Sequence, residues 1–460
     1  MNFFAHLRHE SRWFLAIGGL AGLVVVAFVP PLSTFDAPSH FYRALQISRG
    51  HLRPVRYSDT QLGGRMPRGE SRFAHTLWES YWIKHRFLTV SGWSALAREQ
   101  PGDRERIREE FTNTAVYNPA NYVPQALGMG LSRIFTPSPL WEHRAACAVN
   151  LLFYLALVTM VIETIPRFQA PVALLASTPM LLIQSATVSA DGLNFAAPML
   201  AFALTWRLWS EPGRGNRPEL AAVPSLSVFT ALLKPTNITC LGCLCFLPSA
   251  RFGSRARRTA WLAATFAAAL AAWLAWNRPY LDVNIGGWYI AGFPPVSAQK
   301  AWLFAHPWSF VHSLYSFLHI SLPNQWGYGY SDVGGWIQDP TYAFVFRLGN
   351  LFLPVLLLNA ACGAGRDWKW AGICLGQAAV LLVAIALTLW LTRGDPSVDY
   401  IPWLGGRYLF VFFAFVLAGW SSLTGFRFPA AGWCLFGLGL AMNVVGLAAI
   451  LAPTVAMTAG

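Results

Sequence analysis

The amino-acid sequence predicts an all-α polytopic membrane protein with about 11 transmembrane helices. Of its 460 residues, 55% are hydrophobic and only 12% are charged, which is too few charges to cover a soluble globule. Apolar runs recur along the chain, and about 20 helical residues are needed to cross the hydrocarbon core of a bilayer. The 21 tryptophans and 14 tyrosines suit the aromatic belts at the two membrane interfaces.

The predicted spans succeed one another with no repeat and no low-complexity tract between them, and residues 1–460 are interpreted as a single integral membrane domain. No small-residue cleavage site follows the first apolar run, so this helix is expected to be retained. Residues 220–249 are divided at Lys234 and Pro235, because proline ends or kinks a helix and two half-length helices can form a hairpin. The spans are 13–31, 140–163, 170–189, 191–210, 220–233, 236–249, 259–276, 341–361, 370–391, 406–424 and 429–452.

Short basic loops predict the orientation of the chain. If the N-terminus is cytoplasmic, every short loop rich in arginine or lysine lies on the cytoplasmic side, as the positive-inside rule requires. The C-terminus is then extracytoplasmic, and three segments lie outside, at 32–139, 277–340 and 392–406. The net charge of +13 is therefore interpreted as a topology signal, and no nucleic-acid partner is expected.

The segment after the first span predicts an amphipathic helix in the plane of the membrane. Asp36, His40 and Arg43 are spaced i, i+4, i+7 and face the aqueous side, while the apolar side faces the bilayer. Asp36 either caps this helix or acts as a carboxylate at the membrane surface, and the two roles are compatible. Farther along, GDRERIREEF indicates a short exposed helix, and NPANYVPQALGMGLSRI indicates an amphipathic return to the membrane.

Three further ionisable residues interrupt apolar runs on the same predicted side. Asp191 stands between two spans, where a carboxylate must cap a helix, pair with a cation or act chemically. Lys234 stands at the helix break and either extends to the interface or lines a cavity. Arg407 follows two glycines, which allow a close approach to a ligand, and its guanidinium suits the phosphate of a ligand or of an ordinary lipid. Together these residues offer a base for a hydroxyl and cations for a departing phosphate.

Five segments resemble, in order, the motifs of an uncharacterised family of bacterial multi-spanning membrane proteins that is grouped with the GT-C glycosyltransferases. They are PPLSTFDAPSHFYRALQISRGHL, NPANYVPQALGMGLSRI, TPMLLIQSATVSADGLN, LLKPTN and LGGRYLF. GGWIQD, at residues 334–339, resembles a further motif more faintly. The resemblance covers nearly the whole chain. It implies a GT-C-like transmembrane bundle in the bacterial cytoplasmic (inner) membrane.

GT-C enzymes transfer a sugar from a polyprenyl-phosphate carrier to an acceptor outside the cytoplasmic membrane, and their catalytic acid lies in the first outer loop. The resemblance therefore implies a polyprenyl-phosphate-linked sugar donor, a glycan or envelope acceptor, and contact with membrane lipids. The acid maps onto Asp36, expected to act as general base in an inverting transfer. We assign Asp191 to catalysis, then Arg407, Lys234 and Arg43 to the donor phosphate, and His40, Tyr42, Tyr408 and Asn194 to substrate orientation.

No cofactor is expected. The family often has Asp-Glu where this chain has Asp36-Ala37, so a divalent metal has little support. The CxxCxC cluster at 240–245 lies in an apolar run without a nearby His or carboxylate, and is interpreted as packing.

Two other functions are compatible with the sequence. A transporter or flippase of lipid-linked glycans would also need a cationic cavity, but it should place paired charges near the midplane and show internal symmetry. A non-catalytic envelope assembly protein would tolerate the change of Asp36 or Asp191 to asparagine, whereas an enzyme would not.

Overall fold

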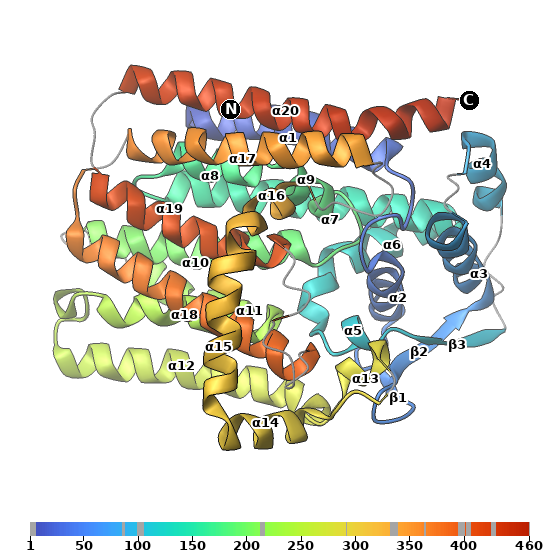
Figure 1. The fold of residues 1–460 in the computed structure, drawn as a ribbon, viewed down its shortest axis with the longest axis horizontal. Helices are drawn as coiled ribbons and strands as arrows, with labels where there is room; N and C mark the ends of the chain where they lie inside the picture. The colour runs from blue at the N-terminus through green and yellow to red at the C-terminus, as the bar shows by residue number, and fades with distance from the viewer. Residues whose placement is uncertain are drawn as a thin grey trace.

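The computed structural model describes residues 6–84, 88–98, 105–211, 217–290, 292–331, 339–362, 365–393, 401, 406–424 and 429–459. In these residues long helices lie side by side, and short helices and strands gather at one end of the bundle (Figure 1). Seven of the described helices are long and apolar enough to cross a membrane. The prediction of a predominantly helical, polytopic membrane protein is therefore confirmed.

The long apolar helices supply most of the bundle. Large apolar side chains such as Leu20 and Leu152 are exposed on its outer faces, where lipid rather than water would cover them. The seven are α1 (His9–Phe28), α7 (Pro139–Thr164), α12 (Arg255–Asn277), α17 (Asp339–Ala361), α18 (Trp368–Arg393), α19 (Phe410–Thr424) together with the 3₁₀ turn Gly406–Leu409 that precedes it, and α20 (Pro429–Ala459).

The remaining four predicted spans fold into shorter or less apolar helices. The range 170–189 forms two short buried helices, α8 (Gln169–Ala176) and α9 (Pro179–Ser185), instead of one span. The break has a local cause, because Ser177 and Thr178 close the end of α8 and a proline begins α9. The range 191–210 is α10 (Asp191–Ser210), which lies in the interior with most of its side chains buried.

The predicted break at Lys234 and Pro235 is confirmed. Helix α11 (Arg217–Leu233) ends one residue before Lys234, whose backbone is extended, with φ −140° and ψ 143°. Pro235 then begins the 3₁₀ helix η4 (Pro235–Phe246), which is followed by η5 (Ser249–Phe252). Because proline has no N–H to donate to the preceding turn, the chain changes direction at this point.

The described residues of 32–139 form a compact unit next to the bundle end, with an apolar core to which α7 also contributes Leu140, Ala146 and Cys147. Its elements are α2 (Ala37–Ser48), β1 (Val55–Arg56), β2 (Leu62–Pro67), α3 (Arg68–Trp78), η2 (Glu79–Ile83), α4 (Val90–Arg98), β3 (Arg106–Glu110), α5 (Thr112–Ala115), η3 (Pro119–Tyr122) and α6 (Val123–Phe135). The three strands form an antiparallel sheet in the order β1-β2-β3.

The prediction of an exposed helix for GDRERIREEF is wrong. Arg106–Glu110 is strand β3, which pairs with β2 in the register Gly63 to Glu110 and Pro67 to Arg106. Arginine and glutamate favour helix locally, but pairing with a distant strand overrides that preference. Glu109, in the same strand, is buried and accepts hydrogen bonds from Ser71 and His75.

Helix α2 is present where the sequence predicts it, but its apolar side does not face the bilayer. Phe41, Ala44 and Leu45 are fully buried in the core of the 32–139 unit. Helix α6 instead exposes an apolar face through Leu127 and Leu131. The amphipathic pattern of α2 is therefore satisfied by protein packing.

The segment expected to be the second outer loop, residues 277–340, is largely helical. Tyr330, near its end, lies in the main core and donates to Asn443 Oδ1 at 2.9 Å. Its elements are η6 (Arg278–Tyr280), α13 (Ile285–Tyr289), α14 (Val296–Ala305), α15 (Pro307–Ser316), η7 (Phe317–Ser321) and α16 (Leu322–Ser331). The GGWIQD motif, apart from the backbone of its last residue, and most of the predicted 392–406 loop lie outside the described residues.

Candidate functional site

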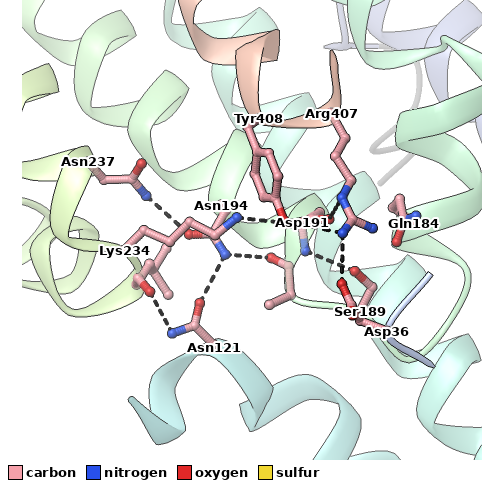
Figure 2. A network of polar contacts seen from close by, with 12 residues as sticks. Asp36, Asn121, Gln184, Ser189, Asp191, Asn194, Lys234, Asn237, Arg407 and Tyr408 are labelled. Atoms are coloured by element: carbon pink, nitrogen blue, oxygen red, sulfur yellow. Dashed lines mark hydrogen bonds and ion pairs between the residues drawn. The ribbon is translucent and has the colours of Figure 1, made fainter. Parts of the chain in front are cut away.

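Four of the predicted site residues form one charge cluster, defined here as Asp36, Asp191, Lys234 and Arg407 (Figure 2). Arg407 Nη2 bonds Asp36 Oδ2 at 2.8 Å, and Arg407 Nε lies 3.9 Å from Asp191 Oδ2. Lys234 Nζ bonds Asp191 Oδ1 at 3.0 Å. Arg407 thus stands between the two carboxylates, and charges of opposite sign alternate along the chain of contacts. Four segments far apart in the sequence meet here.

Asp36 occupies the N-cap position of α2, but its carboxylate makes no capping hydrogen bond to the helix. The residue has left-handed backbone angles, φ 58° and ψ 9°, which cost on the order of 1–3 kcal/mol for a residue other than glycine. Its carboxylate bonds Arg407 and also accepts from Asn113 Nδ2 at 3.0 Å. The side chain therefore faces the cluster, and Asp36 begins the helix through its backbone without a capping bond from its carboxylate.

Asp191 is the first residue of α10, and Ala190 occupies the N-cap position. Its backbone N–H donates to Ser189 Oγ at 3.2 Å, while its carboxylate bonds Lys234. Polar side chains of neighbouring helices fix the backbone just before this residue, because Gln125 and Asn150 both donate to the carbonyl of Ser189. The carbonyl of the buried connection between α9 and α10 thereby has its hydrogen-bond partners, and the position of Asp191 is fixed.

Three asparagines connect the segments that carry Asp191 and Lys234 (Figure 2). Asn194 Nδ2 donates to Asn121 Oδ1 at 3.0 Å, and Asn237 Nδ2 donates to Asn194 Oδ1 at 3.1 Å. Asn121 Nδ2 donates in turn to the carbonyl of Leu233, next to the helix break. The sequence predicted a role for Asn194 alone. Asn121 lies in NPAN and Asn237 in KPTN. Each is an amide side chain close to a helix start in apolar surroundings, and this pattern could have indicated a polar contact.

Arg407 belongs to the 3₁₀ turn η8 (Gly406–Leu409). A Cβ atom at Gly406 would lie 2.2 Å from the carbonyl oxygen of Gln325 and from the backbone nitrogen of Gly329. Glycine is therefore required because η8 packs directly on α16. The predicted close approach exists, but it is made to protein backbone, and the neighbouring Gly405 lies outside the described residues.

The Arg407 guanidinium also has an unused donor. Nη2 donates to Asp36 and to Tyr408 OH, whereas Nη1 is buried without an acceptor among the described residues. The Tyr408 ring lies 4.8 Å from Lys234 Nζ and 5.1 Å from Arg407 Cζ, so it contacts both cations through its face. Tyr408 therefore lies against the charge cluster, and the orienting role predicted for it stays a prediction.

His40 lies beside the cluster. Its Nδ1 atom hydrogen-bonds Tyr122 OH at 2.8 Å, and it lines a small cavity of about 10 Å³ together with Asp36. Burial lowers the pKa of His40 to about 4, although the nearby Asp36 carboxylate opposes this shift. The imidazole is therefore neutral at pH 7.

Arg43 and Tyr42 are not brought to the cluster. Arg43 is fully buried, and its guanidinium donates to Gln46 Oε1 at 2.5 Å and to the carbonyls of Leu52 and Tyr117. Tyr42 packs against aromatic rings in the core of the 32–139 unit. Both residues stabilise this unit, and the aqueous orientation predicted for Arg43 is wrong because its guanidinium is buried and binds Gln46 and two partly buried carbonyls.

A cavity with a volume of about 320 Å³ lies against the charge cluster. Asp191, Lys234 and Arg407 form part of its wall, and Asn113 lines both this cavity and the small one beside Asp36. Its other walls are mainly apolar side chains from α10, α18 and α19, among them Phe195, Leu381, Ile385, Leu389, Phe410 and Val411. The site therefore joins an ionic end to an apolar space.

The described residues contain no group of three or more His, Cys, Asp or Glu side chains placed to hold a metal ion. In the cluster each carboxylate bonds a cationic side chain, which is a poor arrangement for a further positive ion. What the site presents is hydrogen-bond donors and positive charge beside an apolar wall.

Fold and site together define a multi-pass helical membrane protein with a partly buried ionic cluster beside an apolar cavity. The chain belongs to the predicted membrane protein family DUF2142, whose model matches residues 20–416. The matched range contains all four residues of the charge cluster. No curated protein matches the chain.

Proposed function

We propose that the protein transfers a sugar from a polyprenyl-phosphate carrier to an extracytoplasmic glycan or envelope acceptor, with Asp36 as general base. The observation that carries this proposal is the junction of the charge cluster with the apolar cavity. A lipid-linked sugar phosphate has the matching parts, because its phosphate is anionic and its chain is apolar. The proposal places the enzyme in the GT-C superfamily.

Two groups in the cluster can bind the donor phosphate. Arg407 Nη1 has no acceptor among the described residues, so it can donate to a phosphate oxygen without losing an existing contact. Lys234 carries three ammonium protons, and Asp191 accepts one of them. The isoprenoid chain would then lie along the apolar wall formed by α18 and α19.

The proposed reaction is a single displacement with inversion. Asp36 takes the proton of the acceptor hydroxyl, whose oxygen forms a bond to the anomeric carbon. The bond between that carbon and the phosphate oxygen breaks, and the phosphate leaves with the electron pair. A phosphate bound to Arg407 weakens the attraction between Arg407 and Asp36, which makes the carboxylate a better base when the donor is present. Asp191 holds Lys234 in place and, in this proposal, orients sugar hydroxyls.

The proposed location is the bacterial cytoplasmic membrane, with the cluster on the extracytoplasmic side and the N-terminus in the cytoplasm. The distribution of basic residues in short loops supports this orientation. The 32–139 unit also supplies Asp36 to the cluster, together with Asn113, which donates to the Asp36 carboxylate. Lipid-linked donors and envelope acceptors meet on that side of the membrane.

The test is transfer from a panel of radiolabelled polyprenyl-phosphate sugars by purified protein in proteoliposomes. We expect wild type to transfer one of them, Asp36→Asn to bind that donor without transferring it, and Arg407→Gln to lose donor binding. Asp59→Asn is the control, because Asp59 is an exposed acid of the same unit that pairs with Arg56 at its surface. Equal transfer by wild type and Asp36→Asn would remove Asp36 from the mechanism.

The same experiment separates the alternative functions. Movement of the labelled donor across the membrane without transfer would support a transporter or flippase. Neither binding nor transfer of any donor would support a non-catalytic assembly protein.

A further inference from the structure

The Asp36 carboxylate is held on both of its oxygens, and each residue that holds it has a second polar atom without a partner in the part of the chain that the structure describes. Asn113 Nδ2 donates to Oδ1 at 3.0 Å, and Arg407 Nη2 donates to Oδ2 at 2.8 Å. Asn113 Oδ1 and Arg407 Nη1 are both buried, and neither has a hydrogen-bond partner among the described residues. One unused acceptor and one unused donor therefore flank the proposed base.

The orientation of the Asn113 amide follows from the chemistry of its neighbour. An ionised carboxylate only accepts hydrogen bonds, so the amide must present its NH₂ group to Asp36. The amide oxygen and nitrogen are separated by roughly 2.2 Å, which places Asn113 Oδ1 within about 5 Å of Asp36 Oδ1. The unused acceptor thus lies close to the place where the reacting hydroxyl must bind.

Buried carbonyl oxygens almost always find a donor, because leaving one unpaired away from water is unfavourable. Asn113 is only 7% exposed, and it lines both the large cavity and the small cavity beside Asp36. Asn113 Oδ1 itself is closed to solvent in the structure, so a bound group reaches it when the side chains around the small cavity move apart. What it must supply is a hydrogen-bond donor next to the hydroxyl that Asp36 deprotonates.

We propose that Asn113 Oδ1 accepts a hydrogen bond from a second acceptor hydroxyl, adjacent to the reacting one, so that the acceptor is a saccharide with a vicinal diol. This inference rests on the proposed function and leaves its bond-making and bond-breaking steps unchanged. Neighbouring ring hydroxyl oxygens lie about 3 Å apart, and each can donate over about 2.7–2.8 Å, so one diol can serve both Asp36 and Asn113. A lone hydroxyl, as in a serine side chain or a simple alcohol, would leave Asn113 Oδ1 unpaired.

Asn113 then has two roles that variants can separate. Through Nδ2 it positions Asp36, and through Oδ1 it contacts the acceptor. Asn113→Ala removes both contacts. Asn113→Asp keeps an acceptor oxygen for the diol but removes the donor to Asp36, so only the positioning role is lost.

The experiment uses the full chain in proteoliposomes with the labelled donor that wild type accepts. The acceptor probes are methyl glycosides of common hexoses and their monodeoxy analogues, each of which lacks one hydroxyl. For the analogue that lacks the hydroxyl next to the reacting one, wild-type kcat/KM should fall roughly 10- to 100-fold. In Asn113→Ala the same deletion should cost at most about threefold, because the partner of that hydroxyl is already gone. Asn113→Asp should be slower overall but keep the discrimination.

Asn359→Ala is the matched control. Asn359 is also a buried asparagine that donates through Nδ2, here to the carbonyl of Gly432 at 2.9 Å, and its Oδ1 is likewise without a partner among the described residues. It lies in α17 and does not line the cavities beside the cluster. Its replacement should lower stability without changing the ratio of parent to deoxy acceptor.

The outcomes distinguish this inference from the proposed function. If transfer occurs but wild type and Asn113→Ala have the same parent-to-deoxy ratio, the diol contact is refuted and the glycosyltransferase remains. If wild type transfers nothing from any donor, the proposed function fails and the inference fails with it. If Asn113→Ala does not fold, wild type decides the matter, since equal use of n-hexanol and the methyl glycosides overturns the diol requirement.

Discussion

Lys234→Met should destabilise the protein, and a second change, Asp191→Asn, should restore much of the loss. Methionine has nearly the length of lysine, so the substitution removes the charge and keeps most of the volume. In the single variant the Asp191 carboxylate, 11% exposed, loses its partner at 3.0 Å and keeps only Arg407 Nε at 3.9 Å. A buried charge that loses its partner is strongly destabilising, whereas the neutral double variant leaves no charge to compensate.

The distances set the size of the effect. At an effective dielectric constant of about 20, opposite charges at 3.0 Å attract by about 5.5 kcal/mol and at 3.9 Å by about 4.3 kcal/mol, before desolvation is subtracted. Removing one partner of a buried pair costs about 3–5 kcal/mol, and the remaining Arg407 contact favours the lower end. We expect a loss of about 3 kcal/mol for Lys234→Met and about 1 kcal/mol for the double variant.

The assay is reversible unfolding in mixed micelles titrated with denaturing detergent, with wild type, both single variants and the double variant compared as a cycle. Glu105→Gln is the control, because its ion pair with Arg68 is 59% and 63% exposed and should contribute less than about 1 kcal/mol. The buried-pair argument is refuted if Lys234→Met lowers the free energy of unfolding no more than Glu105→Gln does. It is also refuted if the loss in the double variant exceeds the sum of the losses in the two single variants.

Three further outcomes follow from the described contacts. Asn194→Leu removes the donor to Asn121 Oδ1 and the acceptor for Asn237 Nδ2, and it should lower the free energy of unfolding by about 2–4 kcal/mol. A loss below about 1 kcal/mol in thermal unfolding would show that the amide chain is not structural. His40 has a pKa of about 4 in the folded protein against 6.5 for an ordinary histidine, so between these values the unfolded chain binds a proton that the folded protein does not. The free energy of unfolding should therefore fall as pH falls through this window, by roughly 3 kcal/mol at most, and His40→Gln should flatten that slope in pH-dependent unfolding. Arg43→Met should cost about 2–4 kcal/mol because it removes the hydrogen bonds of a buried guanidinium to Gln46 Oε1 and to two partly buried carbonyls. It should leave donor affinity unchanged, and an altered donor Kd would return Arg43 to the phosphate site.

Residues that interrupt an apolar pattern were predictable from the sequence. Asp191 and Lys234 stand in or beside long apolar runs, where a charge needs a partner, and the structure pairs them with each other. The helix break at Lys234 was also predictable from local sequence, because the proline that follows it ends or kinks a helix. Such signals depend on the residue and its nearest neighbours.

What sequence reasoning missed depends on contacts between distant segments. Asn113 lies in a polar stretch without periodicity, so nothing local marks it as the partner of Asp36. The strand Arg106–Glu110 exists because β2 is available to pair with it. Arg43 shares a helix face with Asp36 and His40, yet the carbonyls that occupy its guanidinium come from residues 52 and 117. Helical spacing indicates which side chains share a face but not what that face meets.

The ion pair between Asp36 and Arg407 joins residues 371 positions apart, so the site can form only after most of the chain has been synthesised. At about 5–20 residues per second, a ribosome adds the second partner on the order of 20–70 s after the first. A nascent chain that ends before residue 407 already carries both acids and the lysine, but it lacks the residue that stands between the two carboxylates. Assembly of the cluster is therefore a late event in biogenesis, and a product truncated before residue 407 lacks a complete cluster even when most of its helices are in the membrane.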